Sequence, residues 1–426
     1  MDRRHFIKQT GLTLSALPLL PALSRQSSYK LALIGCGWWG MNILREAMAF
    51  GENKVVGLCD VDSQALELAA KEVNSLKGDK PKLYKDYREL IQKEKPEIAI
   101  IGTPDHWHAL PAIAAIKAGA HLYLEKPIGH TIGEGQAILK TARDYGKVVQ
   151  VGTHRRVSPH NISAMKFLRE GKVGKISQVK CFINYGQGPG KAAADAEPPK
   201  GLDWDFWVGP GAETAYNPRI HPKGFRNFLN FANGTIADWG IHWFDQVLWW
   251  TEEKFPKTVY STGGRFVRED NSDAPDTQMA IYEFEDFTLT WEHKLCAPNA
   301  YIDHNVGCFF YGTKGTLHLG WRDGWTFYPK DKNAQVMKEK PQLHAPDDQN
   351  IKELWADFMS SIETGSTPVC DIELGHRATN LSLLGMLSYK LGRSVAWDGE
   401  KEKIIGDKEA NKLLKRKYRG DWEYPA

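Results

Sequence analysis

Three ionisable side chains are spaced so that they could act on a single proton. His242 lies four residues after Asp238 and three residues before Asp245, so all three would share one face of a helix. An imidazole, with an unperturbed pKa of ~6.5, can take up and return a proton near neutral pH. Asp238 could orient the His242 ring and stabilise its protonated form, whereas we expect Asp245 to be structural. In the alternative interpretation, His242 is a structural histidine packed among the neighbouring aromatic residues.

A glycine-rich loop could hold a dinucleotide. Residues 35–40 read GCGWWG, after the apolar run 31–34 and before a helical stretch that ends at Phe50. In such a loop the first glycine permits a tight turn, the second lets the backbone approach a pyrophosphate, and the third allows close packing of helix and strand. The residues expected to contact the cofactor here are Gly35, Cys36, Gly37, Trp38, Trp39 and Gly40.

An acidic residue follows the next expected strand at the position that selects the cofactor. Residues 55–59 form an apolar run that ends at Asp60, 20 residues after Gly40. A carboxylate there accepts hydrogen bonds from the ribose hydroxyls of NAD and would repel the 2′-phosphate of NADP. The sequence therefore predicts NAD. Alternatively, Asp60 merely caps the helix that follows.

The elements that must position these residues alternate between strand and helix. After the first two strands, helical stretches at 84–93, 109–118 and 132–145 are interleaved with apolar runs at 98–102, 121–124 and 148–152. Such alternation predicts an α/β unit with a doubly wound parallel sheet of the Rossmann type, over residues 28–152. Ligands of such sheets gather at the carboxyl ends of the strands.

Four short stretches and one longer run together point to a known family. In chain order they are GCGWWG at 35–40, TPDHWH at 103–108, EKP at 125–127, DWGIHWFD at 238–245 and the run 371–398. With them the sequence resembles the glucose–fructose oxidoreductase/inositol dehydrogenase/MocA family of NAD(P)-dependent sugar oxidoreductases, and the last run looks like the family's exported subgroup. One departure is Asn233-Gly234, where the family often has two glycines.

The resemblance implies roles for further residues. It places Lys126 and the Asp238–His242 face at the carbinol of a sugar, where an ammonium stabilises developing alkoxide charge. We therefore expect His242 to be the general base, with Lys126 and Asp238 as the other catalytic residues. Further expected cofactor contacts, at the nicotinamide end, are Thr103, Pro104, His108, Glu125 and Lys126. From their position alone, His154, Arg155 and His160 follow the last strand and could reach sugar hydroxyls, or else are surface or interdomain polar residues. Tyr185 and His376, which begins a C-terminal helix, are further candidate substrate contacts.

No metal site is expected. The two imidazoles of His106 and His108 do not clearly converge, and no set of His and carboxylate residues has metal-ligand spacing. The six cysteines are scattered without a CxxC pair, which excludes a disulfide scaffold but leaves one isolated bridge open.

The rest of the chain predicts a second domain. Residues 153–345 contain β-rich runs that fit the family's open, largely antiparallel sheet, flanked by helices, which serves substrate binding and oligomerisation. Residues 346–426 are expected to be C-terminal helices and a tail that pack back on the core. The resemblance also implies a homodimer or homotetramer formed through the outer face of the open sheet.

The N-terminal residues predict where the protein is located, and the net charge bears on whether it binds nucleic acid. Residues 1–24 combine a charged start, RRHFIK, with a short apolar run and small residues at its end, which resembles a twin-arginine signal peptide. A Sec signal or a basic tail are the alternatives. We expect export of the folded protein to the periplasm, with no membrane association after signal removal. With 55 Lys and Arg against 52 Asp and Glu, bulk charge would not bind nucleic acid.

Three functions remain open at this point. The first is an exported NAD-dependent sugar or glycoside dehydrogenase whose scarce cofactor is held tightly and recycled in place. The second is an NAD-dependent glycoside hydrolase, in which transient oxidation at C3 permits elimination of the aglycone and is then reversed. The third is a non-catalytic periplasmic sugar-binding protein that kept the fold.

Overall fold

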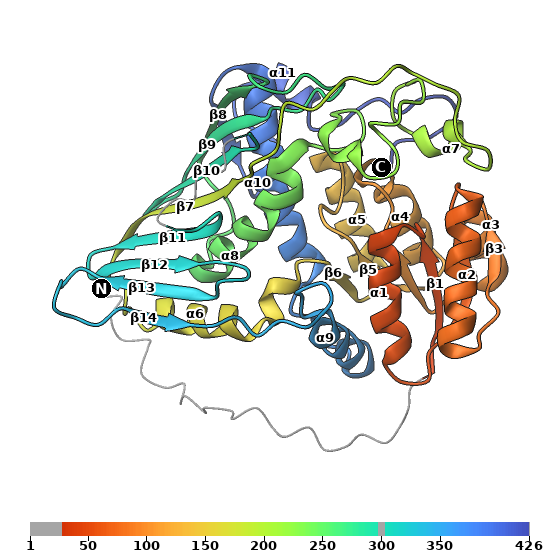
Figure 1. Ribbon diagram of the computed structural model, residues 1–426, viewed down its shortest axis with the longest axis horizontal. Helices are drawn as coiled ribbons and strands as arrows, with labels where there is room; N and C mark the ends of the chain where they lie inside the picture. Colours follow the sequence, from red (N-terminus) through yellow and green to blue (C-terminus); the bar gives the residue numbers. More distant parts are fainter. Residues whose placement is uncertain (1–27, 297–302, 426) are drawn as a thin grey trace.

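The computed structural model describes residues 28–296 and 303–425, which form two sheets with helices packed on and between them (Figure 1). The expected signal peptide, residues 1–24, lies outside the described residues. Among the residues described, none of the helices combines the length and apolar character needed to span a membrane.

The first sheet has six parallel strands in the order β3-β2-β1-β4-β5-β6. The strands are β1 (Lys30–Ile34), β2 (Lys54–Cys59), β3 (Lys82–Tyr84), β4 (Ile98–Ile101), β5 (His121–Leu124) and β6 (Val149–Val151). The helices between them are α1 (Trp38–Ala49), α2 (Ser63–Lys77), α3 (Tyr87–Glu94), α4 (Ala109–Lys117) and α5 (Ile132–Asp144). The central strand β4 is buried throughout, as expected for a strand covered on both faces. The predicted doubly wound sheet is confirmed.

The second sheet has ten strands in the order β14-β13-β12-β11-β7-β10-β9-β8-β15-β16. Only β7 and β10 pair in parallel, and the other pairs are antiparallel. The predicted largely antiparallel sheet is therefore confirmed. Its strands are β7 (Ile176–Asn184), β8 (Thr258–Gly264), β9 (Thr277–Glu283), β10 (Thr288–Lys294), β11 (Val306–Gly312), β12 (Gly315–Leu319), β13 (Trp325–Pro329), β14 (Met337–Glu339), β15 (Val395–Asp398) and β16 (Lys403–Ile404).

Helices α8 (Ile241–Thr251) and α10 (Ile372–Leu391) lie between the two sheets (Figure 1). Helix α10 packs on α8, β8 and α5, so it joins the second sheet to the first. Helix α9 (Ile351–Thr364) packs on α1, and its Trp355 stacks on Tyr123 of β5 with ring centroids 5.5 Å apart. The remaining helices are α6 (Pro159–Arg169), α7 (Trp204–Val208) and α11 (Lys408–Lys412).

A long connection from β7 to α8 returns across the first sheet; we call residues 186–235, which include α7, the strap. Its backbone bonds to the loop after β2, where Ser63 N donates to Gly201 O and Asp203 N donates to Val61 O, both at 3.0 Å. Within α7, the ring of Phe206 stacks on Trp107, which follows β4. These contacts hold the strap against the carboxyl ends of the first sheet's strands, where a nucleotide would bind.

Candidate functional site

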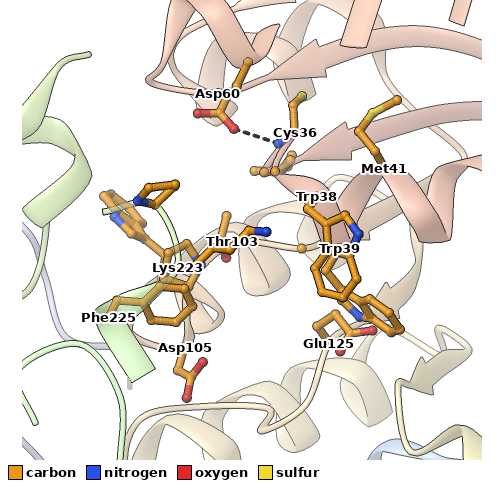
Figure 2. Close-up of a pocket in the computed structure, with 18 of the residues that line it drawn as sticks. Cys36, Trp38, Trp39, Met41, Asp60, Thr103, Asp105, Glu125, Lys223 and Phe225 are labelled. Atoms are coloured by element: carbon orange, nitrogen blue, oxygen red, sulfur yellow. Dashed lines mark hydrogen bonds between the residues drawn. The ribbon is translucent and has the colours of Figure 1, made fainter. Parts of the chain in front are cut away.

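A cleft of about 690 Å³ lies where the two sheets meet. Its lining includes the strand ends of the first sheet, one face of α2, parts of the strap, and the turn before α8 with the first turn of α8. Figure 2 shows the glycine-rich loop and Asp60 on one side of this space and the strap residues Lys223 and Phe225 on another. All the residues expected to bind the cofactor line this cleft except Gly40, which packs behind it.

The glycine-rich loop has the geometry that dinucleotide binding requires. Gly35 has φ +96°, and a Cβ at Gly40 would lie 2.1 Å from the Gly35 carbonyl oxygen, so helix and strand approach closely only without side chains. A Cβ at Gly37 would meet nothing within 4 Å. Gly37 thus borders open space of the kind that a pyrophosphate fills, and the residues present fit a dinucleotide.

Asp60 holds the end of β2 against this loop. One carboxylate oxygen accepts a hydrogen bond from Cys36 N at 2.7 Å, drawn in Figure 2, and the other accepts one from Asp62 N at 2.9 Å. Burial raises the pKa of Asp60 to about 6. The helix cap of α2 is Asp62, which accepts from Gln64 N, so the interpretation of Asp60 as the helix cap is wrong.

Lys126, at the end of β5, reaches across the cleft to the second domain. Its Nζ donates to both the backbone oxygen and Oδ1 of Asp238, each at 2.8 Å. Arg226 of the strap donates to the same Oδ1 at 3.3 Å. Although burial alone would raise the pKa of Asp238, the two cations hold it below its usual value. Two positive charges therefore share one carboxylate at this point of the cleft.

His242 lines the same cleft from the first turn of α8. Its side chain is nearly buried, and no described residue hydrogen-bonds to its Nδ1. Burial, followed by the charges of Lys126 and Arg155, holds the pKa of His242 well below its usual value, so the ring is neutral at pH 7. The ring of His154 lies 5.1 Å away, centroid to centroid.

The predicted orientation of His242 by Asp238 is wrong for this structure. Asp238 lies in a π-helical turn (Ile236–Gly240) before α8, not in a continuous α-helix with His242. Among the described residues its carboxylate bonds to Lys126 and Arg226, and no bond to His242 is present. Asp245 forms a buried ion pair with Arg156 at 2.8 Å and does not line the cleft.

The other expected site residues divide into two groups. His154 and Arg155 line the cleft together with Thr103, Pro104, His108 and Glu125. His108 ties two strand-end loops together, since its ring nitrogens lie 2.6 Å from Pro127 O and 2.8 Å from Thr103 O.

Three expected substrate residues do not line the cleft. His376 lies on α10 and contacts Glu402, with Nε2 2.7 Å from Oε1. Tyr185 lies behind the lining residue Trp239, with ring centroids 5.8 Å apart, and His160 is fully buried in α6. In each case sequence order placed the residue near a strand or helix end, whereas packing turned the side chain elsewhere.

Several lining residues were not predicted. Asp105 is buried beside the Lys126–Asp238 pair, and burial raises its pKa to about 7. It lies inside the TPDHWH motif after β4, so the motif could have identified it. Arg226 and Lys223 come from the strap, where no motif marks them. Trp239 and Trp321 line the other side, with ring centroids 5.6 Å apart.

His106 and His108 do not face a common point. His106 Nε2 lies 3.0 Å from Trp207 O, whereas His108 bonds to the two carbonyls already described. The cysteines of the described residues are free thiols, although Cys181 and Cys308 face each other across β7 and β11 with sulfurs 3.2 Å apart.

A Rossmann sheet with a nucleotide loop, followed by an open sheet that closes a shared cleft, defines a two-domain NAD(P)-dependent oxidoreductase. The chain belongs to the Gfo/Idh/MocA oxidoreductase family. Residues 29–153 match its NAD-binding Rossmann-fold domain and residues 174–424 match its C-terminal alpha/beta domain. The predicted cofactor, NAD, is thereby confirmed.

Known relatives include both hydrolases and dehydrogenases. A glycosyl hydrolase family 109 protein from Stenotrophomonas maltophilia is 30% identical over 193 residues, which are 43% of this chain and 42% of that protein. The chain therefore matches less than half the length of this relative.

Two solved structures share the fold. Aldose–aldose oxidoreductase from Caulobacter crescentus, solved with glycerol, has a TM-score of 0.65 at 17% identity, over 87% of this chain and 100% of that chain. Levoglucosan dehydrogenase, solved with NADH and levoglucosan, has a TM-score of 0.65 at 19% identity, over 87% of this chain and 99% of that chain.

Proposed function

We propose that this protein is an NAD-dependent oxidoreductase that oxidises a carbinol of a sugar or glycoside. The observation that carries the proposal is the meeting of Lys126, from the nucleotide domain, and His242, from the second domain, in the cleft that the glycine-rich loop and Asp60 border. A hydroxyl held between an ammonium and a neutral imidazole can lose its proton while the carbon loses a hydride.

Each residue then has a definite task. Bound NAD would supply the acceptor for the hydride that leaves the carbinol carbon. Lys126, fixed by Asp238, donates a hydrogen bond to the substrate oxygen and stabilises negative charge that develops there. His242, neutral at pH 7 and lining the cleft, accepts the hydroxyl proton on its imidazole ring. The C–H and O–H bonds break, and a carbonyl remains.

Aromatic rings beside this point suit a sugar. Trp239 and Trp321 line the cleft, and the guanidinium of Arg155 lies 5.6 Å from the centre of the Trp321 ring. A pyranose presents C–H groups on its faces and hydroxyls at its edges, so it can pack on an indole and bond to a cation at the same time.

The test is hydride transfer by two variants that still hold NAD. Lys126→Met and His242→Ala are each expected to slow hydride transfer to a sugar or glycoside panel by about 100-fold or more, the usual contribution of a positioned acid or base. Lys140→Met, an exposed lysine on α5, is the matched control. Near-normal turnover in both site variants would contradict the assignment.

A second candidate function, NAD-dependent glycoside hydrolysis, is supported by the glycosyl hydrolase relative. Oxidation at C3 would acidify the neighbouring C–H, allow elimination of the aglycone and then be reversed. Product identity measured together with nicotinamide absorbance separates the two functions: cleavage without net NADH indicates a hydrolase. Binding of sugar with neither product would indicate a binding protein.

We also propose that NAD is held tightly and recycled in place, by reduction of a second sugar or another acceptor. The strap supports this, because it bonds to the loop after β2, and Lys223 lies 5.4 Å over the ring of Trp38 in the glycine-rich loop. Denaturing the purified protein should release about one NAD per chain, and a nucleotide-free supernatant would contradict the proposal.

Location and assembly complete the proposal. The RRHFIK start supports twin-arginine export to the periplasm, which is tested by fractionating cells that express wild type or the Arg3→Lys, Arg4→Lys double variant.

Tyr260, Met279 and Ile281 are exposed on β8 and β9, which supports a dimer or tetramer through this sheet. Light scattering of Met279→Glu should show smaller particles than wild type.

A further inference from the structure

Three side chains with metal-ligand chemistry meet at one end of the second sheet. His304 precedes β11, His318 lies in β12, and Asp323 lies in the turn between β12 and β13. One ligand atom from each lies within 4.8 Å of the others. Asp323 Oδ2 is 2.5 Å from His304 Nδ1 and 3.7 Å from His318 Nδ1.

The hydrogen bonds of His318 leave a lone pair facing a carboxylate. Its Nε2 lies 3.3 Å from the carbonyl oxygen of Val306, which can only accept, so Nε2 carries the proton. Nδ1 then has only a lone pair, has no hydrogen-bond partner among the described residues, and faces Asp323 Oδ2. The His318 side chain is 0% exposed, so water does not separate these two acceptors freely. The Asp323 side chain is 40% exposed, so the pair lies at the edge of the buried region. Two facing acceptors, one of them fully desolvated, are unfavourable unless a cation lies between them.

The second ring nitrogen of His304 also has an oxygen partner. Its Nε2 lies 3.1 Å from the hydroxyl oxygen of Tyr328, which can accept a hydrogen bond from the Nε2–H group when Nδ1 is a metal ligand. In metal sites the second ring nitrogen of each ligating histidine typically donates to a backbone carbonyl, a carboxylate or another oxygen. Val306 and Tyr328 supply such partners here, and both Nδ1 atoms remain directed toward Asp323.

The backbone is shaped to bring the three groups together. A Cβ at Gly320 would lie 1.8 Å from Asp323 Oδ1, and a Cβ at Gly307 would lie 2.6 Å from His318 Nε2. The two imidazole rings stack with centroids 3.5 Å apart. Bonds of ~2.0–2.1 Å in a tetrahedral zinc site place ligand atoms about 3.3 Å apart. The distances from Asp323 Oδ2 to the two Nδ1 atoms, 2.5 and 3.7 Å, bracket this value, so small side-chain movements bring the three atoms to one ion.

We propose that His304 Nδ1, His318 Nδ1 and Asp323 bind a divalent transition-metal ion, zinc, with water as the fourth ligand. Two imidazoles and one carboxylate suit zinc, whereas magnesium and calcium prefer sites made wholly of oxygen ligands. The ion would fasten the turn after β12 to β11. That turn carries Trp321, which lines the cleft, so the metal would position one wall of the substrate site without taking part in hydride transfer.

Zinc binding is measured on tag-free full-length protein after removal of metal by a chelator. Wild type is expected to take up one zinc ion per chain by elemental analysis and, with cobalt instead, to show visible absorption of a tetrahedral site. Asp323→Asn and His304→Gln should each weaken zinc binding at least 10-fold. His344→Gln is the matched control, because His344 pairs with Glu353 on the surface, away from the cluster.

A second measurement covers variants that fold poorly. Zinc added to metal-free wild type should raise its thermal midpoint, since an ion that binds only the folded state stabilises it. Equal zinc uptake by wild type and Asp323→Asn, loss of uptake only in His344→Gln, or no rise in the wild-type midpoint would each overturn the proposal. Because none of these readouts involves turnover, failure of the metal site is distinguishable from failure of the proposed function.

Discussion

Replacing Asp105 by asparagine should change how the stability of the protein depends on pH. Asp105 is buried at the cleft, near Lys126 and Arg226 but also near the carboxylate of Asp238. Burial raises its pKa from 3.8 to about 7 despite the two nearby cations. The side chain is therefore largely protonated in the folded protein at pH 6 and ionised in the unfolded chain.

The direction in which stability changes with pH follows from the difference between the folded-state and unfolded-state pKa of Asp105. Because the folded-state pKa is the higher one, Asp105 contributes stability that is fully present below pH 3.8 and is lost as pH rises through about 7. The difference between the two pKa values corresponds to about 4 kcal/mol in total, of which about 2.5 kcal/mol is lost between pH 5 and pH 8. The amide introduced by Asp105→Asn does not titrate, so the variant escapes this loss.

Urea unfolding at pH 5 and pH 8 measures the effect. Relative to wild type, Asp105→Asn should gain about 2.5 kcal/mol in free energy of unfolding on going from pH 5 to pH 8. Asp144→Asn, an exposed aspartate on α5, is the control and should follow wild type at both values. If Asp105→Asn and wild type show the same pH dependence, Asp105 is ionised in the folded protein and the reasoning is wrong.

Three other predictions concern the cofactor and acid stability. Gly37→Val should weaken NAD binding by about 100-fold, measured by titration calorimetry of NAD-free protein, because its side chain enters the open cleft. Its free energy of unfolding in urea should change by no more than about 1 kcal/mol, the cost of a poor helix cap. Gly201→Val should loosen the strap, because Gly201 has φ +95° and a Cβ would lie 2.3 Å from Ser63 Oγ. NAD release, measured by stopped-flow displacement, should then be at least 10-fold faster. Unchanged release would show that the strap does not retain NAD. Burial lowers the pKa of His293 to about 4, so the stability that His293 contributes above pH 6.5 is lost as pH falls toward 4. Between pH 7 and pH 4.5, His293→Gln should therefore lose less free energy of unfolding than wild type. An equal loss in both proteins would contradict this.

Local spacing was enough to predict the nucleotide half of the site. The GCGWWG loop and Asp60 lie within 26 residues of one another, and a strand–turn–helix unit places them with little help from the rest of the chain. The EKP motif likewise ends a strand, so Lys126 had to lie at the same sheet edge. By contrast, the short edge strand β3 was missed, because Lys82, Leu83 and Tyr84 are partly exposed and have no apolar pattern.

Contacts between distant segments could not be predicted in this way. Arg226 reaches Asp238 because the strap crosses the first sheet, and no periodicity in residues 186–235 indicates where the strap goes. His376 was expected at the cleft because it begins a helix near the core. Its ring instead contacts Glu402 of the C-terminal segment.

The partner of Asp238 decides how the proposed proton transfer has to work. If Asp238 stabilised the protonated His242 ring, His242 would be a strong base. The carboxylate instead bonds to Lys126 and Arg226. Burial, and then the positive charge that remains nearby, makes His242 a weak base. That same positive charge favours an alkoxide over a neutral hydroxyl, so it makes the substrate a stronger acid. Proton transfer depends on the difference between the pKa of the substrate hydroxyl and the pKa of the protonated His242 ring, and the positive charge lowers both. The site can therefore move the proton to a neutral imidazole only when a hydroxyl lies within reach of Lys126, which couples proton removal to correct placement of the substrate.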